Sequence, residues 1–80
     1  MTEQIKDWII HWFEKRNPGI DIDASRDYYE MRLLDSFGII ELIDVLEEHF
    51  AIVFSDEDFR QAEFRTIQGL SSIIAAKQPG

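Results

Sequence analysis

The 80-residue chain contains no cysteine, which excludes disulfides, thiolate metal sites and a cysteine nucleophile. Its longest apolar stretches are only a few residues, far short of the roughly 20 residues that a membrane-spanning helix needs. No basic segment leads into an apolar run at the N-terminus, so we expect no signal peptide. These absences predict a soluble, cytoplasmic protein.

Basic residues are few and unevenly placed. The chain has 8 Lys and Arg against 16 Asp and Glu, a net charge of −8, which disfavours binding to nucleic acid or to an anionic membrane. No Lys or Arg lies between Leu33 and Phe59. That window holds Asp35, Glu41, Asp44, Glu47, Glu48, Asp56, Glu57 and Asp58. The excess charge therefore lies in one third of the chain, where its field favours partners with basic patches.

The length predicts one small domain over 1–80. A chain of this size buries only about 60% of its unfolded surface. That leaves little room for both a packed core and an enclosed active site, which disfavours an enzyme. We expect a monomer whose residues 78–80 form a disordered tail.

Apolar spacing predicts an all-α fold, a small bundle of three longer helices and one short helix. The first helix covers 3–16, with Thr2 as its cap. Ser55 is placed to cap a short helix over 56–59, and Thr66 to cap the last helix. No stretch has the alternation typical of a strand.

Residues 17–35 are predicted to be a long connection between the first two helices. A structureless loop of this length is unusual in a compact domain. Apolar residues recur along it: Ile20, Ile22, Tyr28, Tyr29, Met31, Leu33 and Leu34. We therefore expect the loop to pack across the bundle, with a short helical turn over 28–30.

A metal site is not predicted in this loop. The run Asp21-x-Asp23-x-Ser25-x-Asp27 starts like a calcium-binding loop. The sixth position is Arg26 instead of glycine, and the twelfth is Arg32 instead of glutamate.

The second helix is expected to begin at Asp35 or Ser36, which both suit a helix start, and to end at Phe50. At about 100° per residue, one side holds the apolar set Ile39, Leu42, Ile43, Leu46 and Phe50. The opposite side holds the partner-binding candidates: Glu41, Asp44 and Glu48, with Glu47 on the flank and Phe37 and Ile40 among them. Apolar side chains ringed by charge are typical of a binding surface.

Ser36 has no neighbour that would make it a nucleophile. Ser-x-Gly is half of a nucleophile elbow, but Leu34 replaces the first glycine and no strand precedes it. The simplest reading is a serine that only begins a helix. The alternative is a modification site, because the positive end of the helix dipole would favour a phosphodiester on its hydroxyl. Gly38, one turn further, would leave open space beside it.

The order of these features resembles that of the acyl carrier proteins over nearly the whole chain. The triplet Asp35-Ser36-Phe37 is similar to the Asp-Ser-Leu motif of that family. The match continues through the acidic helix, the Asp56-Glu57-Asp58 segment and the Thr66-Ile67 start of the last helix.

The resemblance implies that Ser36 carries 4′-phosphopantetheine, flanked by Asp35, Phe37 and Gly38, and that the arm's thiol holds an acyl or aminoacyl group as a thioester. Three kinds of partner are implied: a phosphopantetheinyl transferase, a loading ligase or transferase, and a downstream acyltransferase or synthase with a basic docking patch. The implied fold is the small helical bundle already predicted. The implied function is that of a carrier without catalytic residues.

Two departures from the family pattern favour a specialised carrier. Fatty-acid carriers usually read Gly-Ala-Asp-Ser-Leu-Asp around the serine. Here the string is Leu-Leu-Asp-Ser-Phe-Gly over 33–38, which is more similar to D-alanyl carriers and to carriers served by AMP-forming ligases. A housekeeping fatty-acid carrier is the alternative within the family. An unmodified acidic adaptor for a basic partner protein is the alternative from another class.

Overall fold

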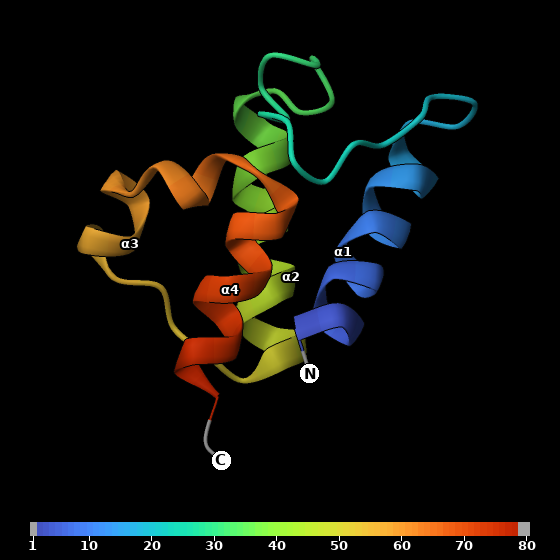
Figure 1. Ribbon diagram of the computed structural model, residues 1–80. Coiled ribbons are helices and arrows are strands. Elements are labelled where there is room, and N and C mark those ends of the chain that lie inside the picture. The colour runs from blue at the N-terminus through green and yellow to red at the C-terminus, as the bar shows by residue number, and fades with distance from the viewer. Residues whose placement is uncertain (1, 79–80) are drawn as a thin grey trace.

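A computed structural model describes residues 2–78 of the protein. It contains α1 (Thr2–Arg16), α2 (Ser36–Phe50), the short α3 (Asp56–Arg60), the 3₁₀ helix η1 (Ala62–Arg65) and α4 (Ile67–Lys77) (Figure 1). Within this range there is no strand, and the one isolated bridge joins Asp27 to Thr66. The predicted all-α fold is confirmed. η1 was not predicted, and Thr2 lies inside α1 rather than before it.

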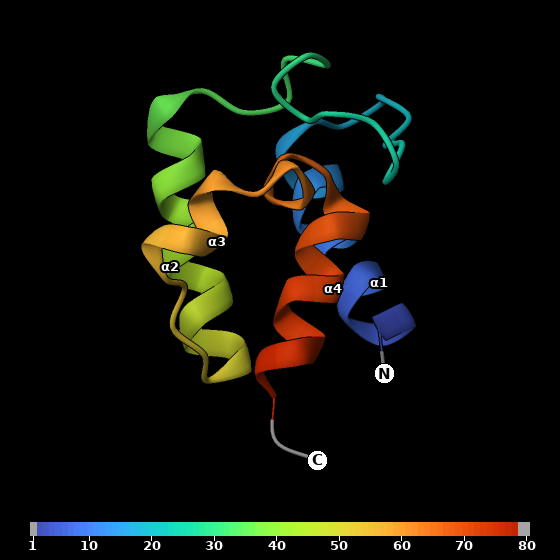
Figure 2. The same cartoon turned by 60° about the vertical axis from the view of Figure 1, so that its left-hand side comes forward.

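The three longer helices are unequally spaced. α4 packs closely against α1 and against η1, whereas the backbone of α2 stands further from α1 and α4 (Figure 2). Side chains fill the space between them. The buried apolar core contains Ile5, Ile9, Phe13, Tyr28, Leu33, Leu34, Leu42, Leu46, Ile52, Phe54, Phe64, Ile67, Leu70, Ile73 and Ile74. All three longer helices therefore contribute to one core; from the predicted apolar side of α2, Leu42 and Leu46 are buried and Ile39, Ile43 and Phe50 are partly buried.

The long connection is held against the start of α4, as its apolar residues suggested. Tyr28 is fully buried. Its backbone N–H donates to the carbonyl of Arg65 at 3.1 Å, and its hydroxyl donates to the carbonyl of Phe64. Burial raises the pKa of the Tyr28 phenol, so the hydroxyl remains a donor. Two of the expected anchors, Ile20 and Tyr29, are instead exposed.

The predicted turn near residue 28 is also present. The N–H of Met31 donates to the carbonyl of Asp27 at 3.1 Å, closing one helical turn. Leu33 then donates its N–H to the carbonyl of Tyr28 at 3.0 Å. These bonds carry the chain from the buried tyrosine to residues 33–35, directly before α2.

Side-chain caps set the starts of α3 and α4. Ser55 and Asp58 form a reciprocal capping box at α3. The hydroxyl of Thr66 accepts the N–H of Gly69 at 2.9 Å at α4. Both caps were predicted from the residue types. Gln78 donates its N–H to the carbonyl of Ile74, and the rest of the predicted tail, 79–80, lies outside the described residues.

None of the helices in residues 2–78 combines the length and the apolar character needed to cross a bilayer.

Candidate functional site: the start of α2

Ser36 is the first residue of α2, and Asp35 is its N-cap. The Asp35 carboxylate accepts the N–H of Gly38 at 2.7 Å, and its carbonyl accepts the N–H of Ile39 at 3.1 Å. The structure thus decides between the two expected starting residues. Ser36 is exposed, and no group among the described residues hydrogen-bonds to its hydroxyl.

Neither histidine is engaged with Ser36. His11 Nδ1 contacts the carbonyl of Asp7 at 2.8 Å, on α1. The ring of His49 stacks on Trp8 at the other end of α2, with the ring centroids 4.3 Å apart. Ser36 therefore has no paired base of the kind that activates a serine nucleophile. The hydroxyl is accessible to a group delivered from outside.

Gly38 is a packing residue, which corrects the expectation that it opens space beside the serine. It is buried, and a Cβ there would lie 2.8 Å from Leu34 Cδ2, 3.2 Å from Asp35 Oδ1 and 3.5 Å from Arg16 Nη2. The missing side chain leaves room for the side chains of Leu34 and Asp35 beside the first turn, whereas Arg16 lies at an ordinary contact distance. The proximity of Arg16 to Gly38 was not apparent from the sequence, because Arg16 belongs to another helix.

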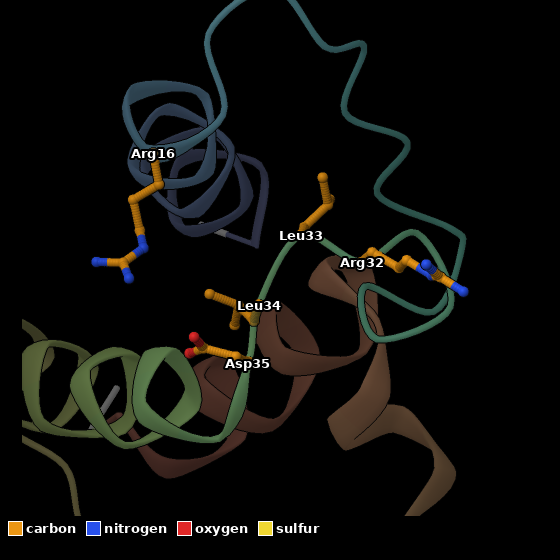
Figure 3. A pocket seen from close by; sticks show the side chains of 5 residues that line it. All are labelled: Arg16, Arg32, Leu33, Leu34 and Asp35. Carbon is orange, nitrogen blue, oxygen red and sulfur yellow. The ribbon is translucent and has the colours of Figure 1, made fainter.

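An open cleft of about 340 Å³ lies beside this turn (Figure 3). Its lining residues are Arg16, Arg32, Leu33, Leu34 and Asp35. In Figure 3 the Arg16 side chain reaches from α1 towards Asp35, whereas the Arg32 side chain points the other way. The cleft thus has one arginine directed at the start of α2.

The predicted acidic face of α2 divides into free and engaged side chains. Phe37 and Ile40 are exposed by 79% and 57%, and Asp44 and Glu48 are also exposed, with no ion-pair partner among residues 2–78. Glu41 is paired with Arg16 of α1, at 2.6 Å between Nη1 and Oε2. The exposed and unpaired part of the face is therefore smaller than the charge pattern suggested.

Glu47 is engaged at the other end of α2. Its carboxylate accepts the N–H of Phe54 at 2.9 Å, and its carbonyl accepts the N–H groups of Ala51 and Ile52. It stabilises the turn that leaves the helix. This turn presents Val53, which is 76% exposed. Sequence reasoning missed Val53, because a single apolar residue in a loop gives no signal of exposure.

Other carboxylates also have internal partners. Asp58 pairs with Lys77 at 2.7 Å, and this contact holds the pKa of the Asp58 carboxyl below its usual value. In the calcium-like run, Asp23 accepts hydrogen bonds from Ser25 and Asp27 pairs with Arg65. Over residues 2–78 no three potential ligand residues gather into a group that could hold a metal.

Comparison with known families gives a match over most of the protein. The family model described as "phosphopantetheine attachment site" matches residues 13–74, which is most of the chain. The protein belongs to this family of phosphopantetheine-binding carriers. Searches of curated proteins and of solved structures found no significant match.

Membership defines the general chemistry of this carrier. It takes 4′-phosphopantetheine as a covalent group on a serine and carries acyl groups linked to that arm. Carriers of this family are not enzymes themselves; they interact with a phosphopantetheinyl transferase and with acyl-handling enzymes.

The start of α2 in this carrier fits such a group. The N–H groups of Ser36 and Phe37 have no partner inside the helix, because the first turn of any helix leaves its amides free. These amides and the positive end of the helix dipole favour a phosphodiester. Bound there, the group would supply a thiol that the cysteine-free chain lacks.

Proposed function

We propose that Ser36 is the residue to which 4′-phosphopantetheine is attached. The chain has five serines. The observation that carries the proposal is whether each serine hydroxyl already takes part in a hydrogen bond. Ser25 donates to Asp23, Ser55 accepts from Asp58, and Ser71 and Ser72 donate to backbone carbonyls in α4. Ser36 alone among them has an exposed hydroxyl without a hydrogen bond in the described residues, at the start of a long helix.

Intact mass after incubation with coenzyme A and a broad-specificity phosphopantetheinyl transferase tests this assignment. We expect one phosphopantetheine group on the wild type and none on Ser36→Ala. Ser72→Ala is the matched control, because it removes an exposed serine hydroxyl from another helix and should be modified normally. An unmodified wild type, or a modified Ser36→Ala, would contradict the proposal.

The docking surface for partner enzymes is proposed to combine Phe37, Ile40, Asp44 and Glu48 with Val53. The three apolar side chains are exposed, and the two carboxylates have no internal counter-charge within the described range. A partner with a basic, partly apolar patch would complement this surface. Glu41 and Glu47, which the charge pattern included, are excluded because they are engaged within the carrier.

The carrier is proposed to serve a specialised pathway in the cytoplasm. The support is the string over 33–38, Leu-Leu-Asp-Ser-Phe-Gly, which resembles carriers loaded by AMP-forming ligases. We expect the modified carrier to accept an acyl or aminoacyl group from such a ligase, measured as a mass increase. Malonyl loading as efficient as that of a fatty-acid carrier would favour the housekeeping alternative.

A further inference from the structure

An ion pair joins α1 to α2. Its acidic member, Glu41, is the carboxylate of the acidic α2 face that comes first after Ser36 in the sequence, and its basic member, Arg16, lies outside the acidic window of residues 33–59. Arg16 is the last residue of α1, and Glu41 lies in the second turn of α2. Their charged atoms are 2.6 Å apart, and the side chains are 38% and 60% exposed. The pair therefore lies at the surface, where a partner protein could compete for it.

Arg16 is held in place by more than this contact. Its guanidinium lies over the ring of Trp12, 4.8 Å from the ring centroid. Its Nη2 also lies beside the first turn of α2, 3.5 Å from the position of a Cβ at Gly38, which is an ordinary contact distance. Stacking on Trp12 thus helps to hold the guanidinium at Glu41, and less side-chain freedom is lost in keeping the pair formed.

We propose that Arg16 acts as a built-in counter-charge that removes Glu41 from the docking surface and directs basic partners to Asp44 and Glu48. This inference rests on the proposed function. A tethered arginine competes at a high effective concentration with any arginine or lysine of a partner. Asp44 and Glu48, further along α2, have no such competitor among the described residues.

The KM of the carrier as substrate for the broad-specificity transferase, with saturating coenzyme A, measures this effect. Arg16→Gln releases Glu41, and Lys15→Gln makes the same charge change on the neighbouring exposed residue. We expect Arg16→Gln to lower KM about twofold to fivefold more than Lys15→Gln does. This fold-change corresponds to the free energy that an exposed ion pair typically contributes. Adding Glu41→Gln to Arg16→Gln should cancel this extra gain, with kcat unchanged.

Glu41→Gln in the wild type should raise KM no more than Glu14→Gln, an equal charge change at an exposed position of α1. Asp44→Asn should raise KM more than either. The inference is overturned if Arg16→Gln and Lys15→Gln behave alike, or if Glu41→Gln weakens binding as much as Asp44→Asn.

The two proposals fail in different ways. If no variant and no wild-type protein gains the mass of phosphopantetheine, the proposed function fails and this inference fails with it. If all variants are modified at Ser36 but Arg16 and Glu41 show no coupling in KM, only the inference about Arg16 is wrong. Circular dichroism of each variant confirms that it is folded.

Discussion

Gly69 is the position where one added carbon should do most damage. It lies in the first turn of α4, and η1 passes directly over it. A Cβ there would be 2.0 Å from the carbonyl oxygen of Glu63 and 2.5 Å from its Cα. Both are backbone atoms, so the clash is relieved only by moving η1 away from α4. That movement would also disturb Tyr28, which hydrogen-bonds to the backbone at the end of η1.

The expected cost of Gly69→Ala is about 2 kcal/mol or more. Overpacking in a well-packed region costs about 1–3 kcal/mol and occasionally more, and backbone displacement puts this site at the upper end. Replacing a helical glycine by alanine returns about 0.5–1 kcal/mol. The loss is a large part of the about 4–12 kcal/mol expected for 80 residues.

Urea unfolding followed by circular dichroism measures the change, and Gly38→Ala is the matched control. At Gly38 the closest obstacle is the Cδ2 end of the Leu34 side chain, at 2.8 Å. That end can rotate away, so we expect Gly38→Ala to change stability by less than about 1 kcal/mol. Equal midpoints for the two variants would show that η1 and α4 do not approach as described.

Two further changes test a helix end and a carboxylate. Ala51 follows α2 with φ 55°, in the left-handed region; Ala51→Gly should raise the free energy of unfolding by about 0.5–1 kcal/mol, and an unchanged urea midpoint would contradict this. The pKa of the Asp58 carboxyl is lowered in the folded protein, mainly by its hydrogen bond from Lys77. The stabilisation of the fold by ionised Asp58 is therefore complete above the unfolded pKa of about 3.8, and it is lost as the pH falls through the lower folded pKa. Asp58→Asn should therefore be less stable at pH 7 and lose less stability below pH 4, as measured by thermal unfolding across pH; parallel curves for variant and wild type would refute it.

Local chemistry determined most of the fold. Helix spans follow from apolar spacing along each segment, and the caps at Asp35, Ser55 and Thr66 follow from residue type, because a cap bonds to amides only two or three residues away. The candidate site at Ser36 was predictable for the same reason, because the first turn of a helix leaves backbone amides free regardless of how the helix packs. The expected turn near residue 28 was likewise a local feature.

Contacts between distant segments decided the rest. The pairing of Arg16 with Glu41 spans 25 residues, and the bond from Tyr28 to Phe64 spans 36. The meaning of Gly38 changed for this reason: its neighbours include an arginine from another helix. Charge counting identified the acidic face of α2, but it cannot tell a free carboxylate from one neutralised by another element. The sequence alone thus determined which helix bears the candidate serine, and the tertiary structure decided which of the charges around it remain available, because ion pairs depend on distances in space that chain order does not specify.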